Sequence, residues 1–472
     1  MRKGPSLLVG VGPGMHSVRC SAILRAARIL LLGWLWMIPG CGPESPRSET
    51  EPATPDPLTS KATGEALANR PLPPDFEPTV RIRVHSLQVP LAAPVVLGSA
   101  PQRLLVLDEL ELRPRILQAP ISCSLDPQAG WLLEDCTGHQ IETTEPCSIS
   151  IRTLAGELPR IHCGDLVCPG TLELIPIQGA AASGLPVDAT PLERVDLVAS
   201  TLIESYLPGV LDGELYGHWP QATFQAQAVA ARSYAVAESG YWRDRRHFDL
   251  IAGPASQAWT GMEASVAARE AVESTRGMLL VHEGRVVPAY YSSCCGGLPA
   301  SARDGISNRS SHAIAPLEAR ASPSPCCEEA PVRQWELRFP LARVQAILAP
   351  ALAESGVGAV TAVAVSNRTD LGRPLEFEVG DEAGRTHRFS ARFFRSLLGR
   401  VAAGEGGTRA SVRSEAFEPE IQDDELVVQG RGFGHGVGLC QFGAFERGRA
   451  GEPWQQITLR YYPSAELVRG WN

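Results

Sequence analysis

The chain has 472 residues, of which 44% are hydrophobic and 20% are charged, and these values are typical of a folded soluble protein with two or three domains. Its formal net charge of -9 predicts an acidic surface that repels a phosphate backbone, and the sequence holds no basic stretch interleaved with aromatic residues. The composition therefore argues against nucleic acid as the main partner.

Residues 1–40 are predicted to be an export signal. Two arginines precede the apolar run Ile29–Ile38, and Cys41 follows it after Pro39 and Gly40. A helix over this run would be about 15 Å long, half of a bilayer core, so we do not expect it to span a membrane. The pattern resembles a lipoprotein signal, which predicts lipidation of Cys41. A plain secretory signal and an uncleaved anchor are the alternatives, and Met15 is an alternative start to Met1.

A lipid on Cys41 would anchor the exported protein to a membrane of the cell envelope. In a cell with two membranes, we expect a periplasmic or outer-membrane location. Residues 41–78 are rich in Pro, Ser, Thr and Glu, cannot bury a core, and are predicted to be a flexible tether. Residues 79–185 are predicted to be a small β-rich region, because short alternating apolar runs are separated by Gly, Pro and Asp.

Cysteine content agrees with export. Beyond the signal, the cysteines form two groups: Cys123, Cys136, Cys147, Cys163 and Cys168, then Cys294, Cys295, Cys326, Cys327 and Cys440. In an exported protein such numbers indicate disulfides, and we expect those of the first group to staple the loops of the β-rich region. Because each group is odd in number, each holds a free cysteine or shares a bond with the other group.

Residues 186–472 mix helical and strand patterns, which predicts a mixed α/β catalytic domain with a substrate groove and an α+β fold for the whole chain. The strongest helix is predicted over Gln221–Glu238, starting after Pro220, with alanines at a spacing that implies close packing. The other predicted elements are a strand at 195–199, a helical turn at 201–206 before Pro208-Gly209, a hairpin at 278–291 around Glu283-Gly284, a strand and helix at 335–348, and a strand at 426–428 before a glycine-rich loop.

Four motifs concentrate polar, aromatic and glycine residues. They are Tyr206–Glu214 with His218-Trp219-Pro220 and Gln225–Tyr234; Asp249–Gly261; Ala289–Gly297; and Gly432–Ala444 with Tyr461-Tyr462-Pro463 behind it. Together they resemble, in unbroken order from about Leu192 to Leu467, the stage II sporulation protein D family, which includes the amidase enhancer proteins. The Gln-Ala-rich helix and the Gly-His-Gly-Val-Gly loop are its most distinctive parts.

The resemblance implies a lytic transglycosylase. Such enzymes cleave peptidoglycan between N-acetylmuramic acid and N-acetylglucosamine without water, leave a 1,6-anhydro end, and favour glycan stripped of its stem peptides. It also implies a partner in peptidoglycan strands, possible coupling to an amidase, and a role in wall remodelling or sporulation. A non-catalytic peptidoglycan-binding protein that enhances an amidase is the alternative on the same fold.

The family's catalytic glutamate precedes the Gln-Ala helix, a position held here by Glu214. A single carboxyl group suffices for this reaction, because the substrate's own C6 hydroxyl replaces the water that ordinary two-carboxylate glycosidases activate. Glu214 must then be protonated near neutral pH, so its pKa must be raised by partly apolar surroundings, which Leu211 and Trp219 can supply. A solvated loop glutamate is the alternative. Glu204 and Asp212 are rival acids, for which structural roles are favoured.

Further candidates for substrate binding accompany Glu214: Arg232, Tyr234, Gln257, Trp259, Ser293, His435 and Gln441. The glycines around His435 allow close backbone approach or positive φ, so this histidine is expected to contact sugar hydroxyls or to orient Glu214, with fixing of a strained loop as the alternative. Arg232 is expected to contact either a substrate carboxylate or an internal acid. Tyr234 and Trp259 are suited to stacking on sugar rings, but aromatic residues at such spacing are more often core residues, so core packing is the favoured role.

The adjacent cysteines admit two interpretations. A disulfide joining one member of Cys294-Cys295 to one of Cys326-Cys327 is favoured, and the alternative is a closed zinc site of these four thiolates. No cofactor is otherwise expected. Cys440 is predicted to be a small packing residue. A cysteine hydrolase that pairs Cys294 or Cys440 with His435 is a third and minor hypothesis for function.

Overall fold

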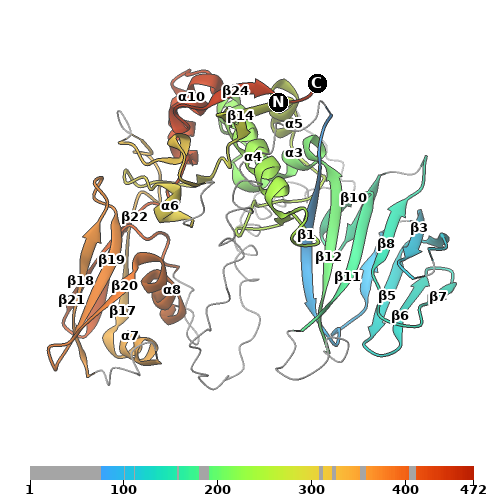
Figure 1. Ribbon diagram of the computed structural model, residues 1–472, viewed down its shortest axis with the longest axis horizontal. Helices are drawn as coiled ribbons and strands as arrows, with labels where there is room; N and C mark the ends of the chain where they lie inside the picture. The colour runs from blue at the N-terminus through green and yellow to red at the C-terminus, as the bar shows by residue number, and fades with distance from the viewer. Residues whose placement is uncertain are drawn as a thin grey trace, which may run out of the picture. The chain divides into compact units, whose positions relative to one another are not determined.

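A computed structural model describes residues 76–99, 101–110, 112–156, 159–179, 191–307, 312–321, 326–350, 358–402 and 411–472 (Figure 1). The predicted export signal, the lipidation of Cys41 and nearly all of the predicted tether lie outside these ranges. Within them, no helix is both long enough and apolar enough to cross a bilayer.

Two antiparallel sheets make up most of the N-terminal part, and their strands alternate buried and exposed residues. One sheet has the strand order β13 (Leu250–Ile251), β1 (Thr79–Gln88), β12 (Leu192–Leu202), β11 (Thr171–Gln178), β8 (Ile149–Thr153), β3 (Arg103–Asp108) and β4 (Arg115–Gln118). The other has the order β10 (Leu166–Pro169), β9 (Arg160–Cys163), β2 (Val95–Leu97), β5 (Ile121–Asp126), β6 (Gly130–Asp135) and β7 (Gln140–Glu142). Within these two sheets, β13 pairs in parallel with β1, and the other strand pairs are antiparallel.

The predicted β-rich region and the α+β class are confirmed. The expected stapling by disulfides is wrong for the described cysteines, all of which are free thiols. Three of the first group lie within strands instead of loops, namely Cys123 in β5, Cys163 in β9 and Cys168 in β10. They are buried core residues, and burial raises the pKa of the Cys123 thiol to about 12.

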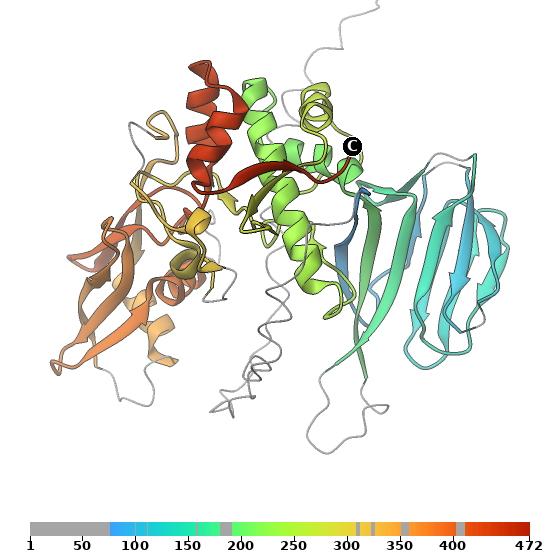
Figure 2. The ribbon, with the colours of Figure 1, turned by 45° about the horizontal axis from the view of Figure 1, so that its top comes forward.

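A helical layer follows β12 and contains α3 (Ile203–Glu214), α4 (Gln221–Trp242), α5 (Val266–Ser274), α9 (Gln441–Arg449) and α10 (Trp454–Tyr461). The long helix α4 contacts each of the other four (Figure 2). Short elements complete this part: sheet β15 (Arg285–Val286), β14 (Met278–His282) and β24 (Glu466–Arg469), the parallel pair β16 (Tyr291–Ser292) and β23 (Leu439–Cys440), α6 (Ala302–Gly305) and the 3-10 turn Ala315–Leu317.

A second hydrophobic core lies between the cysteine pairs and the glycine-rich loop in the sequence. It is built from sheet β17 (Gln334–Pro340), β22 (Glu425–Arg431) and β21 (Phe417–Gln422), sheet β18 (Val360–Arg368), β19 (Pro374–Asp381) and β20 (Thr386–Ser390), and the helices α7 (Leu341–Leu348) and α8 (Ala391–Ala402). Phe377, Phe394 and Phe417 form its centre, with the rings of Phe377 and Phe417 stacked 4.6 Å apart. The sequence predicted β17, α7 and β22 but not a separate core.

The predicted helical turn before Pro208 is too short, because α3 continues through Pro208 to Glu214. Pro208 removes one backbone hydrogen bond, but Tyr206, Leu207 and Val210 are fully buried and hold the helix in place. The predicted long helix begins at Gln221 as expected and extends to Trp242, beyond Glu238. The hairpin turn at Glu283 and Gly284 is confirmed, with positive φ at both residues.

Candidate active site

Glu214 is the last residue of α3, and the packing of that helix sets its position. Two glycines one turn apart, Gly209 and Gly213, face the loop 257–261. A Cβ atom on Gly213 would lie 2.5 Å from the carbonyl oxygen of Ala258, and one on Gly209 would lie 2.0 Å from that of Gly261. Only glycine therefore allows this loop to lie against the helix and to present its backbone to Glu214.

The carboxyl group of Glu214 accepts hydrogen bonds from three separate elements. Its Oε1 accepts from the backbone N–H of Ala258 at 2.8 Å and from the hydroxyl of Tyr291 at 3.4 Å. Its Oε2 accepts from Nε2 of Gln441 at 3.1 Å. The donors belong to the loop after β13, to β16 and to the first turn of α9, so the folded chain fixes this carboxyl group from three directions.

Desolvation dominates the electrostatics of Glu214. Its side chain is half-buried, and desolvation raises the pKa of the carboxyl group above its ordinary value. The hydrogen bonds from Ala258, Gln441 and Tyr291 oppose the rise without cancelling it. Burial therefore favours the protonated form of Glu214, while the three hydrogen-bond donors favour the charged form.

Gln257 is expected to bind substrate, but it is fully buried and acts on Tyr291 instead. Its Nε2 donates to the hydroxyl of Tyr291 at 3.0 Å and to the carbonyl of Ala231 at 3.2 Å, while its Oε1 accepts from the hydroxyl of Tyr206 at 3.2 Å. Because its amide is engaged on both sides, Gln257 positions Tyr291, which in turn reaches Glu214.

A cleft of about 320 Å³ adjoins this network. Tyr291 lines the cleft and donates to Glu214, so its ring connects the open space with the acid. Other lining residues are aromatic, polar or charged: Tyr234, Glu238, Trp242, Arg246, Ser256, Tyr290 and His435. Aromatic faces beside hydrogen-bonding groups are the surroundings that a sugar ring requires.

His435 occupies a loop in which every second residue is a glycine with positive φ, as the sequence predicted: Gly432, Gly434, Gly436 and Gly438. Its Nδ1 accepts from the backbone N–H of Val437 at 3.0 Å. Burial, followed by the charge of Arg373, lowers the pKa of His435 to about 3, although a hydrogen bond with the Tyr291 backbone opposes this. A neutral imidazole that lines the cleft and contacts Tyr291 can orient groups around Glu214 but cannot serve as an acid near neutral pH.

Arg232 contacts an internal acid, which was one of its two expected partners. Its Nε and Nη2 donate to the two carboxylate oxygens of Glu204 at 3.0 and 2.7 Å. Neither side chain is open to substrate, because Arg232 is fully buried and Glu204 nearly so. The assignment of Arg232 to substrate binding is therefore wrong, and the favoured structural role of Glu204 is confirmed.

Asp212, the other rival acid, holds Ser265 at the start of the helix α5. Its Oδ1 accepts from the hydroxyl of Ser265 at 2.6 Å, its Oδ2 accepts from the backbone N–H of that residue, and Ser265 itself is the N-cap of α5. This engagement fits a structural role and leaves Glu214 as the candidate acid.

The remaining candidates differ in how close they come to the cleft. Tyr234 lines it and packs edge-to-face against Tyr290 at 5.4 Å. Trp259 is 6% exposed and packs against Tyr206 at 5.7 Å, which is core packing, the alternative to sugar stacking. Ser293 is half-buried, and its backbone carbonyl accepts from the N–H of Phe442 at 3.1 Å. Gln441 is 4% exposed and is a partner of Glu214.

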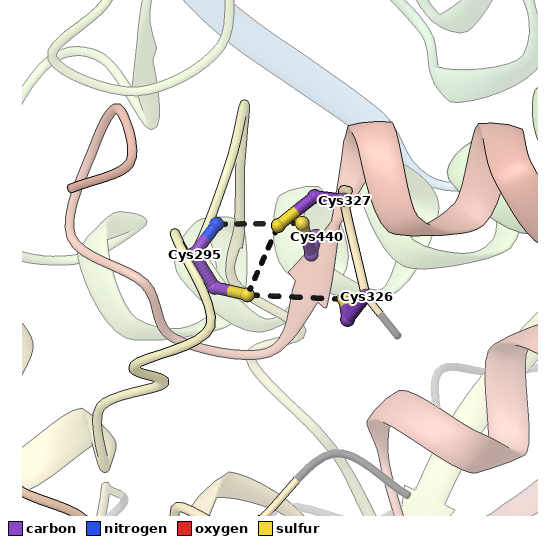
Figure 3. A group of neighbouring side chains, drawn as sticks. All are labelled: Cys295, Cys326, Cys327 and Cys440. Atoms are coloured by element: carbon purple, nitrogen blue, oxygen red, sulfur yellow. Dashed lines mark hydrogen bonds between the residues drawn. The ribbon is translucent and has the colours of Figure 1, made fainter. Parts of the chain in front are cut away.

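The later cysteines do not form the expected disulfide. The sulfur of Cys295 lies 3.8 Å from that of Cys326 and 3.7 Å from that of Cys327, whereas a disulfide bond is about 2.05 Å long. Cys440, predicted to be only a packing residue, accepts a hydrogen bond at its sulfur from the backbone N–H of Cys295 at 3.3 Å (Figure 3). The cluster of sulfur atoms that lie within 4.8 Å of one another therefore contains Cys440 in place of Cys294.

Sequence reasoning missed Tyr291 and the Ala258 N–H as partners of Glu214. Tyr291 belongs to the third motif, two residues before Ser293, and its hydroxyl group could have marked it as a possible hydrogen-bond donor. The backbone donor of Ala258 left no signal in its side chain. The contact of Ala258 with Glu214 follows from the packing of the loop 257–261 against α3, which the sequence does not show.

Comparison with known proteins agrees with the family resemblance of the first two motifs. The model of the stage II sporulation protein family matches residues 192–282, which include α3, Glu214 and α4. An uncharacterized protein of Brachyspira hyodysenteriae is 28% identical over 274 residues, covering 56% of this chain and 66% of that protein. The stage II sporulation protein D of Bacillus subtilis is 24% identical, covering 61% of this chain and 80% of the relative.

The amidase enhancer of Bacillus subtilis is 22% identical, covering 56% of this chain and 40% of the relative. The match thus spans less than two thirds of the Brachyspira protein and of the amidase enhancer. The family match covers the segment that carries the candidate acid and the helix behind it. Residues 192–282 of the chain therefore match the stage II sporulation protein family model, and the relatives named above are similar to the chain at 22–28% identity.

Proposed function

We propose that the protein is a peptidoglycan lytic transglycosylase that uses Glu214 as its single acid and base. The observation that carries the proposal is the state of that carboxyl group. Its pKa is raised by desolvation, yet three hydrogen-bond donors are aimed at its oxygens. A group that must first give up a proton and then take one back needs both properties.

In the proposed reaction, protonated Glu214 donates its proton to the oxygen that links N-acetylmuramic acid to N-acetylglucosamine. The bond from C1 of the muramic acid to this oxygen breaks, and the N-acetylglucosamine leaves with a free hydroxyl. The Glu214 carboxylate then removes the proton of the muramic acid's C6 hydroxyl, and O6 bonds to C1. The product is a 1,6-anhydro ring, Glu214 regains its proton, and no water is consumed.

The donors around Glu214 act during the interval in which it is charged. The Ala258 N–H, the Gln441 amide and the Tyr291 hydroxyl are in place before the proton leaves, so no group must reorganise to stabilise the carboxylate. Gln257 holds Tyr291, and neutral His435 contacts the same segment. Gln257 and His435 are positioning residues, since they act on Glu214 through Tyr291.

Glycan from which stem peptides have been removed is the proposed substrate. The cleft has a volume of about 320 Å³, and Trp242, Tyr234 and Tyr290 offer aromatic surfaces for sugar rings. We further propose that the protein acts in the cell envelope, anchored through a lipid on Cys41, in wall remodelling or sporulation. Coupling to an amidase belongs to the same proposal, because one relative is named an amidase enhancer.

The decisive experiment is incubation of the purified protein with peptide-stripped glycan strands in water enriched in ¹⁸O, followed by mass analysis of the ends. A transglycosylase gives 1,6-anhydro ends that lack the heavy oxygen. Reducing ends that contain ¹⁸O would contradict the proposal and indicate hydrolysis by a second carboxylate, for which Glu238 in the cleft is the available group. Binding of the strands without any new ends would instead favour a non-catalytic amidase enhancer.

The pH dependence of kcat/KM should follow the protonation of Glu214. Only the protonated form can start the reaction, so the rate is full below its pKa and falls about tenfold per pH unit above it. Because this pKa is raised, the fall should begin at a higher pH than an ordinary glutamate allows. His435 does not contribute to this limb, since its pKa is lowered to about 3. A rate that rises with pH over the same range would contradict the acid role.

Replacing Tyr291 by Phe should lower kcat about tenfold, since it removes one hydrogen bond to a charged group. It should also move the alkaline limb of the pH profile to higher pH, because the Tyr291 hydroxyl lowers the pKa of Glu214. The profile is measured for both proteins on the same glycan. A fall in kcat with an unmoved limb would show that Tyr291 matters only for packing.

A further inference from the structure

Four buried thiols converge outside the hydrogen-bond network of Glu214: Cys295, Cys326, Cys327 and Cys440. Their sulfur atoms all lie within 4.8 Å of one another. Figure 3 shows that they come from three segments, namely the loop after β16, the pair at 326–327, and the end of β23 where α9 begins. Cys295 and Cys440 are 145 residues apart in the sequence.

The spacing of these sulfurs fits one metal ion. A zinc ion in a tetrahedron of thiolates has Zn–S bonds of about 2.3 Å, which places neighbouring sulfurs about 3.8 Å apart. The separations of Cys295 from Cys326 and Cys327 are 3.8 and 3.7 Å. We propose that Cys295, Cys326, Cys327 and Cys440 form a closed, structural zinc site in this protein.

The backbone supports this assignment independently. Cys327 has φ of 55°, a left-handed conformation that costs a residue with a Cβ about 1–2 kcal/mol. This conformation lets adjacent cysteines direct both sulfurs into one cluster (Figure 3). Gly443 in α9 makes room for Cys326, because a Cβ there would lie 2.5 Å from its sulfur. Simple packing of a thiol requires neither feature.

The surroundings suit thiolates. Four thiolates and Zn²⁺ carry a net negative charge, and Arg333 lies beside them, donating its Nη1 to the carbonyl of Cys326 at 3.4 Å. The same Nη1 also forms an ion pair with Oε1 of Glu328 at 2.7 Å.

A complete set of four protein ligands leaves no position for water or substrate, so the ion would be structural and not catalytic. It would join three segments that carry parts of the active site. Cys440 immediately precedes Gln441, whose amide donates to Glu214, and it is the N-cap of α9. The metal would thereby fix the first turn of α9 against the loop after β16.

The test measures metal content of the full chain expressed with zinc in the medium and purified without chelator. We expect about one zinc ion per chain by elemental analysis. Replacing the zinc by Co²⁺ should give the visible absorption of a tetrahedral thiolate site. Cys440→Ser should weaken zinc binding at least about 100-fold, measured by competition with a chromogenic chelator. Cys147→Ser, which removes an equally buried thiol of the β-rich region, should leave the zinc content unchanged.

Several outcomes would overturn the assignment. They are iron in place of zinc, a folded wild-type chain without metal, or an intact mass and alkylation pattern showing a disulfide among the four cysteines. Loss of zinc on Cys294→Ser would contradict the ligand set. Glu214→Gln should retain full zinc content, so a failure of the proposed reaction and a failure of the zinc site are distinguishable.

Discussion

Glu214→Gln is expected to abolish the formation of 1,6-anhydro ends, with a decrease in kcat of roughly 10³-fold or more. Glutamine has nearly the shape of protonated glutamate but cannot donate a proton to the glycosidic oxygen or remove one from the C6 hydroxyl. The hydrogen bond from the Ala258 N–H can persist in the variant, so binding of glycan should change little. The measurement is the rate of anhydro-end formation, together with binding of stripped strands.

Two observations would contradict this expectation. Residual activity within about tenfold of the wild type would exclude general acid catalysis by Glu214. Loss of glycan binding together with activity would indicate damage to the cleft, and the circular dichroism spectrum of the variant identifies such damage. Asp212→Asn is a suitable comparison, because Asp212 binds Ser265 and is not among the hydrogen-bond partners of the Glu214 carboxyl group in the described structure.

The raised pKa of Glu214 should also affect the stability of the folded protein. A carboxyl group whose pKa is raised in the folded protein stabilises the fold below its unfolded-state pKa, and this contribution is lost as the pH rises through the folded-state pKa. Wild-type protein should therefore lose stability over that range relative to Glu214→Gln, which carries no charge there. This is the usual opposition between an active-site charge and the stability of the fold.

Arg232→Met is expected to destabilise the protein by about 3–5 kcal/mol, because it leaves the buried carboxylate of Glu204 without its ionic partner. Glu204 would keep the Gly277 N–H at 3.0 Å and the Trp471 indole N–H at 2.9 Å, which do not neutralise its charge. Arg232 also donates to the carbonyl oxygens of Val272 and Met278, which would lose this donor. Urea unfolding at neutral pH gives the free energy of unfolding.

The exposed pair Arg388 and Glu378 provides the matched control, and Arg388→Met should leave the midpoint of unfolding unchanged within error. The double variant Glu204→Leu with Arg232→Met should recover part of the loss, since no lone charge remains buried. A single variant as stable as the wild type would mean that the ion pair contributes nothing to holding α3 and α4 together.

The sequence could predict what depends on local pattern. Pro220 and the alanines that follow located the start of α4, and the alternation of apolar residues located the β-rich region. Glu214 was identified by its place before that helix, which the motif order preserves. The glycines around His435 predicted positive φ because side chains are excluded there.

What remained hidden depends on contacts between distant segments. The roles of Tyr291 and Gln441 follow from where β16 and α9 meet the end of α3, and no local pattern carries that information. The same holds for Cys440, which lies far along the chain from the cysteines that it joins. The sequence left two partners open for Arg232, a substrate carboxylate and an internal acid. The packing of α4 in the folded chain decides for the internal acid, Glu204.

The pairing of β12 has a consequence for how this domain can be separated from the rest. β12 begins the segment matched by the family model and leads directly into α3, yet both of its neighbours, β1 and β11, lie before that segment. A shortened protein starting at residue 186 would expose both edges of β12, with eleven residues of unpaired backbone ready to join another chain. Strands β1 and β11 are thus part of the fold that holds α3, and we expect a shortened protein to stay folded only if it begins upstream of Thr79.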